Sequence, residues 1–153
     1  MSIVDEFSDL VSSHLETLNK EFESELVNFI KFQSNKDVKF FEIEYDSQNF
    51  DYHFSVSIFG MNKVGEDLID HFFLEDKAVV VPKDIFNNEK FQEIEKEKIV
   101  SDILKSWLIN RWKNVGNNEY PTFLAHHDSY FMRNINDGTE INWDQILDLF
   151  KDK

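Results

Sequence analysis

The apolar residues change their spacing partway along the chain, and this change limits the possible folds more than any other feature of the sequence. In residues 3–32 they recur every three or four positions, which predicts one long amphipathic helix. In residues 41–46 and 50–58 they alternate with polar residues, which is typical of strands with one face in water. The residues that join these two segments, Asp46 to Asn49, are typical of a turn, so the sequence predicts a β-hairpin.

The segment after this hairpin is harder to assign, because residues 68–74 fit either a strand or a short helix. Residues 77–81 are rich in β-branched side chains and end at Pro82, which favours a strand. Residues 89–115 return to the helical spacing, and Gly116 with the asparagines after it marks the end of this second helix.

The C-terminal part predicts further strands and one short helix. Residues 122–128 and 130–135 can both extend, and Asp137-Gly138 predicts a hairpin turn. Asn142 and Gln145 have the spacing of a capping box at the start of a last helix. The whole order predicts an α+β fold, with a mainly antiparallel sheet of about four to six strands, two long helices and a short C-terminal helix, the helices packing on one face.

Length and composition indicate a single domain over residues 1–153. A chain of this size should bury roughly 70% of its unfolded surface, and aromatic residues make up 15% of the sequence. No repeat, low-complexity tract or glycine-, serine- or proline-rich linker divides it. Cysteine is absent, no signal peptide is evident at the N-terminus, and no apolar run approaches the roughly 20 residues that cross a bilayer. We therefore expect a cytoplasmic protein.

The acidic residues outnumber the basic ones by 30 to 16, which gives a formal net charge of −14. Such a chain repels nucleic-acid phosphates and anionic lipids, so neither is an expected partner, whereas a basic protein would be attracted. Residues 1–50 hold eleven acidic and four basic residues, a formal charge of −7, and residues 101–153 hold eight and six, a charge of −2. We expect the partner-binding surface on the first helix and hairpin, with these carboxylates in it: Glu16, Glu21, Glu23, Glu42, Glu44, Asp46 and Asp51.

Motifs of familiar enzyme classes are missing. The four glycines are too dispersed for a phosphate-binding loop, and no Gly-x-Ser-x-Gly nucleophile motif occurs. The segment His126-His127-Asp128 is the sharpest candidate for chemistry, since a histidine beside a carboxylate can act as a general base or a metal ligand. In an extended strand, however, successive side chains point to opposite faces, so at most one of these histidines could lie beside Asp128. The sequence predicts no metal site and no cofactor.

In size, charge and lack of catalytic motifs, the chain resembles the small acidic immunity proteins that neutralise bacterial toxins. This resemblance implies a non-enzymatic inhibitor that covers the active site of a basic toxin, such as a nuclease, with carboxylates in place of substrate phosphates. Two alternatives remain open. One is a small hydrolase or metal-binding protein that uses His126, His127 and Asp128, and the other is a structural or regulatory homo-oligomer that associates through a sheet edge or a helix stripe. The acidity could also serve only to keep the protein soluble.

Overall fold

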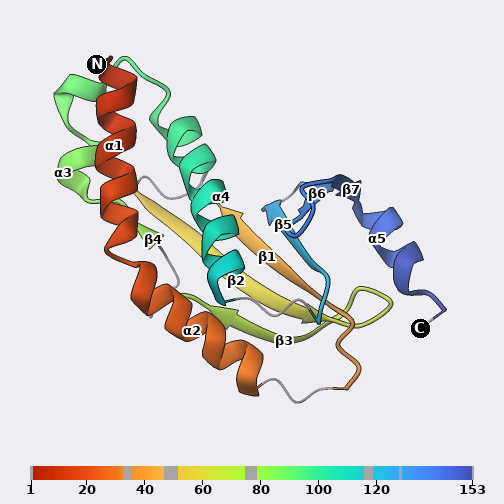
Figure 1. Cartoon of the computed structure of the whole chain (residues 1–153). Helices are drawn as coiled ribbons and strands as arrows, with labels where there is room; N and C mark the ends of the chain where they lie inside the picture. The colour runs from red at the N-terminus through yellow and green to blue at the C-terminus, as the bar shows by residue number, and fades with distance from the viewer. Residues whose placement is uncertain are drawn as a thin grey trace.

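One mixed sheet with helices on both faces forms the fold of the computed structural model (Figure 1). The structure describes residues 2–32, 36–46, 52–74, 79–115, 119–127 and 129–152. The helices are α1 (Ile3–Glu16), α2 (Asn19–Phe32), α3 (Lys83–Phe86), the 3-10 helix η1 (Glu89–Phe91), α4 (Lys96–Val115) and α5 (Trp143–Phe150). The strands are β1 (Phe40–Asp46), β2 (His53–Met61), β3 (Asp67–Phe72), β4 (Val79–Val80), β5 (Thr122–His126), β6 (Phe131–Asn134) and β7 (Glu140–Asn142).

Strand β1 lies in the middle of the sheet. The order across the sheet is β3-β2-β1-β5-β6-β7, and β4 pairs with β2 outside this path. β1 is antiparallel to β2 and parallel to β5, while every other pairing among the described strands is antiparallel. The predicted α+β fold and mainly antiparallel sheet are confirmed, although the described sheet has seven strands, one more than the predicted upper limit.

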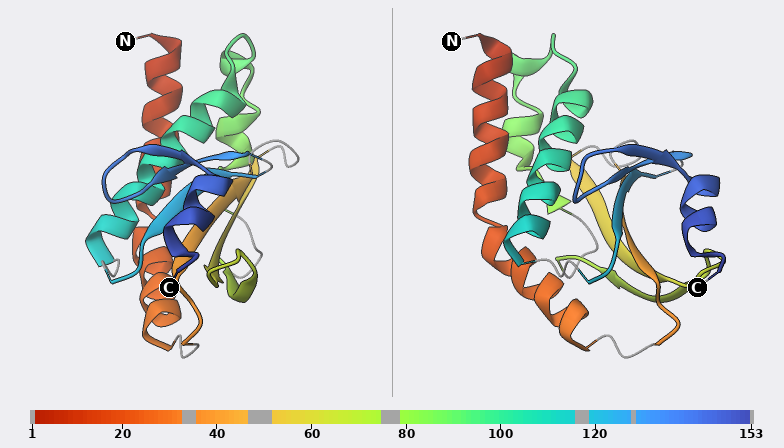
Figure 2. Two further views of the ribbon diagram at one scale, coloured as in Figure 1. Left: turned by 90° about the vertical axis from the view of Figure 1, so that its right-hand side faces the viewer. Right: turned by 45° about the vertical axis from the view of Figure 1, so that its right-hand side comes forward.

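Helices α1, α2 and α4 cover what we call the first face of the sheet (Figure 2). The alternate β1 residues Phe41, Ile43 and Tyr45 point into this layer and are all buried. On the helix side, Phe22 of α2 packs its ring against Trp107 of α4, with the ring centroids 4.8 Å apart. The apolar stripes that the sequence predicts for the two helical regions therefore meet the same sheet.

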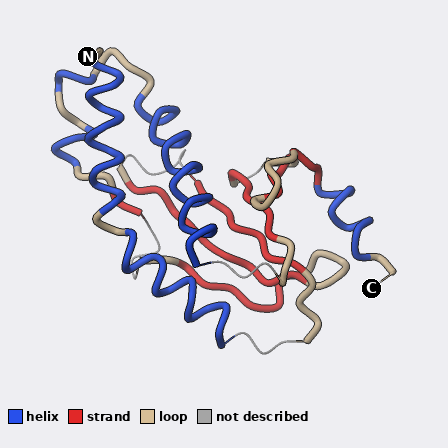
Figure 3. The backbone as a smooth tube through the Cα atoms, viewed as in Figure 1, coloured by secondary structure: helices blue, strands red, loops and turns tan. Residues whose placement is uncertain are grey.

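The opposite side, which we call the second face, carries a smaller apolar cluster under α5. Phe40 of β1 is fully buried there, and its ring stacks on Phe150 of α5 with 5.0 Å between the centroids. The prediction that all helices pack on one face is therefore wrong: Figures 2 and 3 show α5 on the far side of the sheet from α1, α2 and α4. The reason is that Phe40, Met61 and Phe123 give the second face an apolar end that needs its own cover.

A glycine lets the turn between β2 and β3 approach α5. Gly65 has a φ of 83°, which side chains rarely adopt, and a Cβ atom there would lie 2.5 Å from the indole of Trp143. This contact places one end of α5 against the β2–β3 turn. α5 starts at the predicted capping box, since the Asn142 side chain accepts a hydrogen bond from the backbone N–H of Gln145.

The single helix predicted for residues 3–32 is wrong, because the structure has two helices with a break at Thr17 and Leu18. The backbone N–H groups of these two residues donate to carbonyl oxygens three positions back, and the Thr17 hydroxyl also donates to the carbonyl of His14. These bonds tighten the chain and end α1. The apolar spacing continues across the break because both helices pack on the same sheet face.

The other boundaries match the predictions in part. The second long helix begins at Lys96, seven residues later than predicted, because the Asn88 side chain caps the separate short helix η1. Residues 68–74, which fit either a strand or a short helix, lie mostly in strand β3. The predicted turn at Gly138 is present, with a φ of 77°. The predicted turn at residues 46–49 lies mostly outside the described residues. No helix of the described chain combines the length and apolar character needed to span a bilayer.

The packing of α5 predicts a difference between two neighbouring residues of that helix. Phe150 is buried against Phe40, whereas Leu149 is 51% exposed. Phe150→Ala should lower the free energy of unfolding by about 3–5 kcal/mol, because it removes a buried ring and leaves a cavity. Leu149→Ala should lower it by less than about 1 kcal/mol. Urea unfolding of both variants measures this difference, and equal losses would show that α5 does not pack here.

Candidate functional site

Three carboxylates of β1 point to the second face of the sheet, next to the cluster under α5. Side chains alternate along a strand, so Glu42, Glu44 and Asp46 follow Phe40 on this face. In the register of the sheet, Glu42 lies between Phe59 of β2 and Phe123 of β5. The face therefore changes from apolar to acidic within one strand.

Strand β3 adds two further carboxylates near this group. Asp70 lies opposite Phe59 and therefore on the second face, and Asp67 lies close enough to affect the ionisation of Glu42. We call this set the acidic sheet face: Glu42, Glu44, Asp46, Asp67 and Asp70. Strands β1, β2 and β3 contain no lysine or arginine, and neither does α5. No lysine or arginine from these four elements therefore offsets the five carboxylates, and the ion-pair partner of Glu44 is a histidine, His127.

Glu42 is the most unusual member of the acidic sheet face. Its side chain is 7% exposed, and no hydrogen bond or ion pair joins it to another described residue. Burial raises the pKa of the Glu42 carboxyl from 4.5 to about 7, and the negative charges of Glu44 and Asp67 add to the shift. A buried carboxylate without a cation is costly, so near neutral pH this group holds a proton for much of the time.

The outer face of the hairpin is not the wet surface that the alternating pattern predicts. Glu42 and Asp46 are both buried, and Glu44 binds Nδ1 of His127 through its Oε1 atom. The pattern identifies correctly which residues share a face. It does not show that β1 is a central strand, whose second face is partly covered by neighbouring strands and by α5. Asp51 lies outside the described residues.

The predicted carboxylates of the first helical region lie on the other side of the sheet. Glu16 and Glu21 are exposed there. Glu23 is instead paired, since its Oε1 atom lies 3.3 Å from Nη1 of Arg111 and accepts a hydrogen bond from the Asn114 side chain at 3.0 Å. The six predicted site residues that the structure describes therefore divide into two groups on opposite faces.

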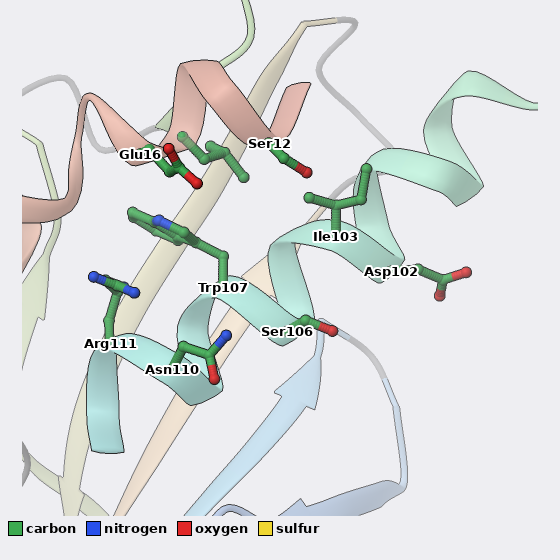
Figure 4. Close-up of a pocket in the computed structure, with 9 residues that line it drawn as sticks. Ser12, Glu16, Asp102, Ile103, Ser106, Trp107, Asn110 and Arg111 are labelled. Atoms are coloured by element: carbon green, nitrogen blue, oxygen red, sulfur yellow. The ribbon is translucent and has the colours of Figure 1, made fainter. Parts of the chain in front are cut away.

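A pocket of about 450 Å³ lies between α1 and α4, beside the first of these groups (Figure 4). Trp107, Leu15 and Ile103 give it apolar walls, and Glu16 and Asp102 are its acidic lining residues. Figure 4 shows the Trp107 side chain reaching from α4 toward α1. The Trp107 indole N–H donates to Asn19 at 2.6 Å, which fixes the ring. Few charged side chains of either sign line this pocket, and its carboxylates are fewer than those of the acidic sheet face.

The two adjacent histidines point to opposite faces of the sheet, as the sequence predicts for a strand. The His126 ring packs edge-on against Tyr45 of the first face, with centroids 5.1 Å apart, whereas His127 binds Glu44 of the second. Asp128 lies outside the described residues. Among the residues that the structure describes, no group of three or more His, Asp or Glu side chains is arranged to hold a metal ion.

Sequence reasoning missed Asp67 and Asp70, since it left the conformation of this segment open. Asp70 shares its face with Phe72, and Ile69 shares the other with His71, so no polar–apolar alternation marks this strand and no local signal would have placed these carboxylates. Comparison of the chain with protein-family models, curated proteins and solved structures gave no match. Function is therefore inferred from the geometry of this chain.

The raised pKa of Glu42 predicts an unusual dependence of stability on pH. Between pH 4.5 and 7 the folded protein holds this proton more tightly than the unfolded chain does. Its contribution to the free energy of unfolding therefore falls as the pH rises through this window. Glu42→Gln removes the group, so the variant should gain up to about 3 kcal/mol relative to the parent protein between pH 4.5 and about 8.

Urea unfolding at a series of pH values measures this difference. Glu97→Gln removes an exposed carboxyl of α4 and makes the same change in net charge, so it serves as the matched control. A Glu42→Gln variant whose stability followed that of the parent protein at every pH would show that Glu42 is an ordinary, hydrated carboxylate.

Proposed function

We propose that this chain is a non-enzymatic binding protein whose acidic sheet face receives a cationic surface of another protein. More specifically, the protein is an immunity-type inhibitor that acts in the cytoplasm on a basic toxin, such as a nuclease. The acidic sheet face supplies carboxylates in the place of substrate phosphates. The side chains that bind the partner include Glu42, Glu44 and Asp46 from the predicted set.

The observation that carries this proposal is the burial of Glu42 without a cation. A buried charge is strongly destabilised unless an opposite charge accompanies it. The described part of the chain supplies no lysine or arginine to this carboxyl, so an arginine or lysine from a partner would stabilise its charged form. The charged form of Glu42 would therefore be more stable in the complex than in the free folded protein.

The surroundings of Glu42 also suit a protein partner. Phe72 lies on the same face as the carboxylates, in register with Ser57, and remains 39% exposed. Asp67 and Asp70 are exposed beside it. An exposed aromatic ring next to charged groups is typical of a binding surface, where the ring provides contact area and the charges steer the encounter.

Two charge-reversal variants test whether the acidic sheet face or the helical layer binds the partner. Asp67→Lys with Asp70→Lys changes the exposed carboxylates of the sheet, and Glu16→Lys with Glu21→Lys changes those of the helices by the same total charge. We expect the sheet variant to raise the Kd for a cationic nuclease toxin by about a hundredfold. The helix variant should raise it by less than about fivefold, through long-range attraction alone.

Calorimetric titration of a panel of purified cationic toxin domains into each variant measures these constants. Equal weakening by the two variants would exclude the acidic sheet face as the binding surface. Binding of no cationic domain by the parent protein would overturn the proposed function itself.

Binding to the acidic sheet face should also release a proton. At pH 6 the Glu42 carboxyl, with its pKa raised to about 7, is mostly protonated. A partner's cation favours the carboxylate, so we expect the release of up to about one proton per complex at this pH. Titration in buffers of different ionisation enthalpy measures the number. The release should disappear in Glu42→Gln and persist in Asp70→Asn, and its persistence in Glu42→Gln would show that another group titrates.

A further inference from the structure

A small pocket on the first face of the sheet gathers basic side chains from three different elements. It has a volume of about 200 Å³, and its lining includes Lys105 of α4, His126 of β5 and Arg133 of β6. It lies on the opposite side of the sheet from Glu42. We propose that this pocket binds the phosphate group of a small molecule, either as inorganic phosphate or as a phosphate monoester.

The sheet register brings the strand residues of this pocket together. Arg133 lies opposite Leu124 in the β5–β6 pair, and His126 lies beside Tyr45 in the parallel β1–β5 pair. Tyr45 and Leu124 both belong to the core of the first face, so Arg133 and His126 are on that face as well. Lys105 then adds a third basic side chain from the neighbouring helix.

The Arg133 guanidinium is held in place without being neutralised. Its Nη1 atom donates to the carbonyl oxygen of Gly138 at 2.9 Å, which anchors one side of the group. Neither Arg133 nor Lys105 makes an ion pair with any described residue. Burial raises the pKa of the Tyr45 phenol, a hydrogen bond with Ser101 lowers it, and the charges of Asp102 and Arg133 act in opposite directions.

The balance of charge in the pocket is opposite to that of the whole chain. Lys105 and Arg133 supply two positive charges against one negative charge from Glu140, the acidic residue among its lining side chains. The formal net charge of the chain is −14. Unpaired cations in a strongly acidic protein attract an anion, and the planar guanidinium with its several N–H donors matches the oxygens of a phosphate group.

Binding of inorganic phosphate to the full chain tests the proposal. The Kd is measured by phosphorus NMR or calorimetry at constant ionic strength, with sodium chloride as the balancing salt. Arg133→Gln and Lys105→Gln should each raise the Kd by about tenfold or more, since each removes a charge-assisted hydrogen bond. Glu140→Gln should lower the Kd, because it removes a like charge from the pocket.

Lys113→Gln is the matched control, since Lys113 is exposed on α4 and its loss makes the same change in net charge. An unchanged Kd in this variant supports a defined site, whereas weakening equal to that of Arg133→Gln would show only diffuse attraction. Absence of saturable phosphate binding in the parent protein would overturn the proposal. Glycerol phosphate distinguishes a phosphate monoester from inorganic phosphate as the ligand. Tighter binding than inorganic phosphate supports a monoester, and weaker binding supports the free ion.

Discussion

Strand β1 is paired on both edges and packed on both faces, and the remaining elements depend on this arrangement. Its first-face residues, such as Phe41 and Ile43, are apolar along the whole strand and hold three helices. Its second face begins with Phe40, which α5 covers, and continues with carboxylates. One strand thus determines where the helices pack and where the sheet becomes acidic.

The distribution of charge differs between the two sides of the sheet. On the helical side, α1 has four acidic residues and no lysine or arginine, whereas α4 has five basic and two acidic residues. One ion pair joins Glu23 of α2 to Arg111 of α4, and another joins Glu6 of α1 to Lys90 of η1. The strands of the acidic sheet face contribute no lysine or arginine. Lysine and arginine therefore offset part of the negative charge on the first face, whereas the strands of the acidic sheet face add none on the second.

Local features of the sequence predicted local structure well. The cap of α5 at Asn142, the turn at Gly138 and the strand at β1 depend on residues a few positions apart, and all three are confirmed, although β1 lacks the predicted wet face. The helix break at Thr17 was not predictable from the apolar spacing, since the helices on its two sides pack on one face. The burial of Glu42 was also not predictable, because Phe123 and α5, which cover that region, come about eighty positions or more later in the chain.

The parallel pairing of β1 with β5 also affects how the protein folds. Phe41 and its partner Thr122 are 81 positions apart, which is the difference between their residue numbers. Contacts between such distant residues form slowly, because a long loop must close before they are made. While the chain is being synthesised, β1 emerges from the ribosome well before β5, so one edge of the future central strand stays open. An open strand edge can pair with another chain, so this interval exposes the nascent protein to aggregation.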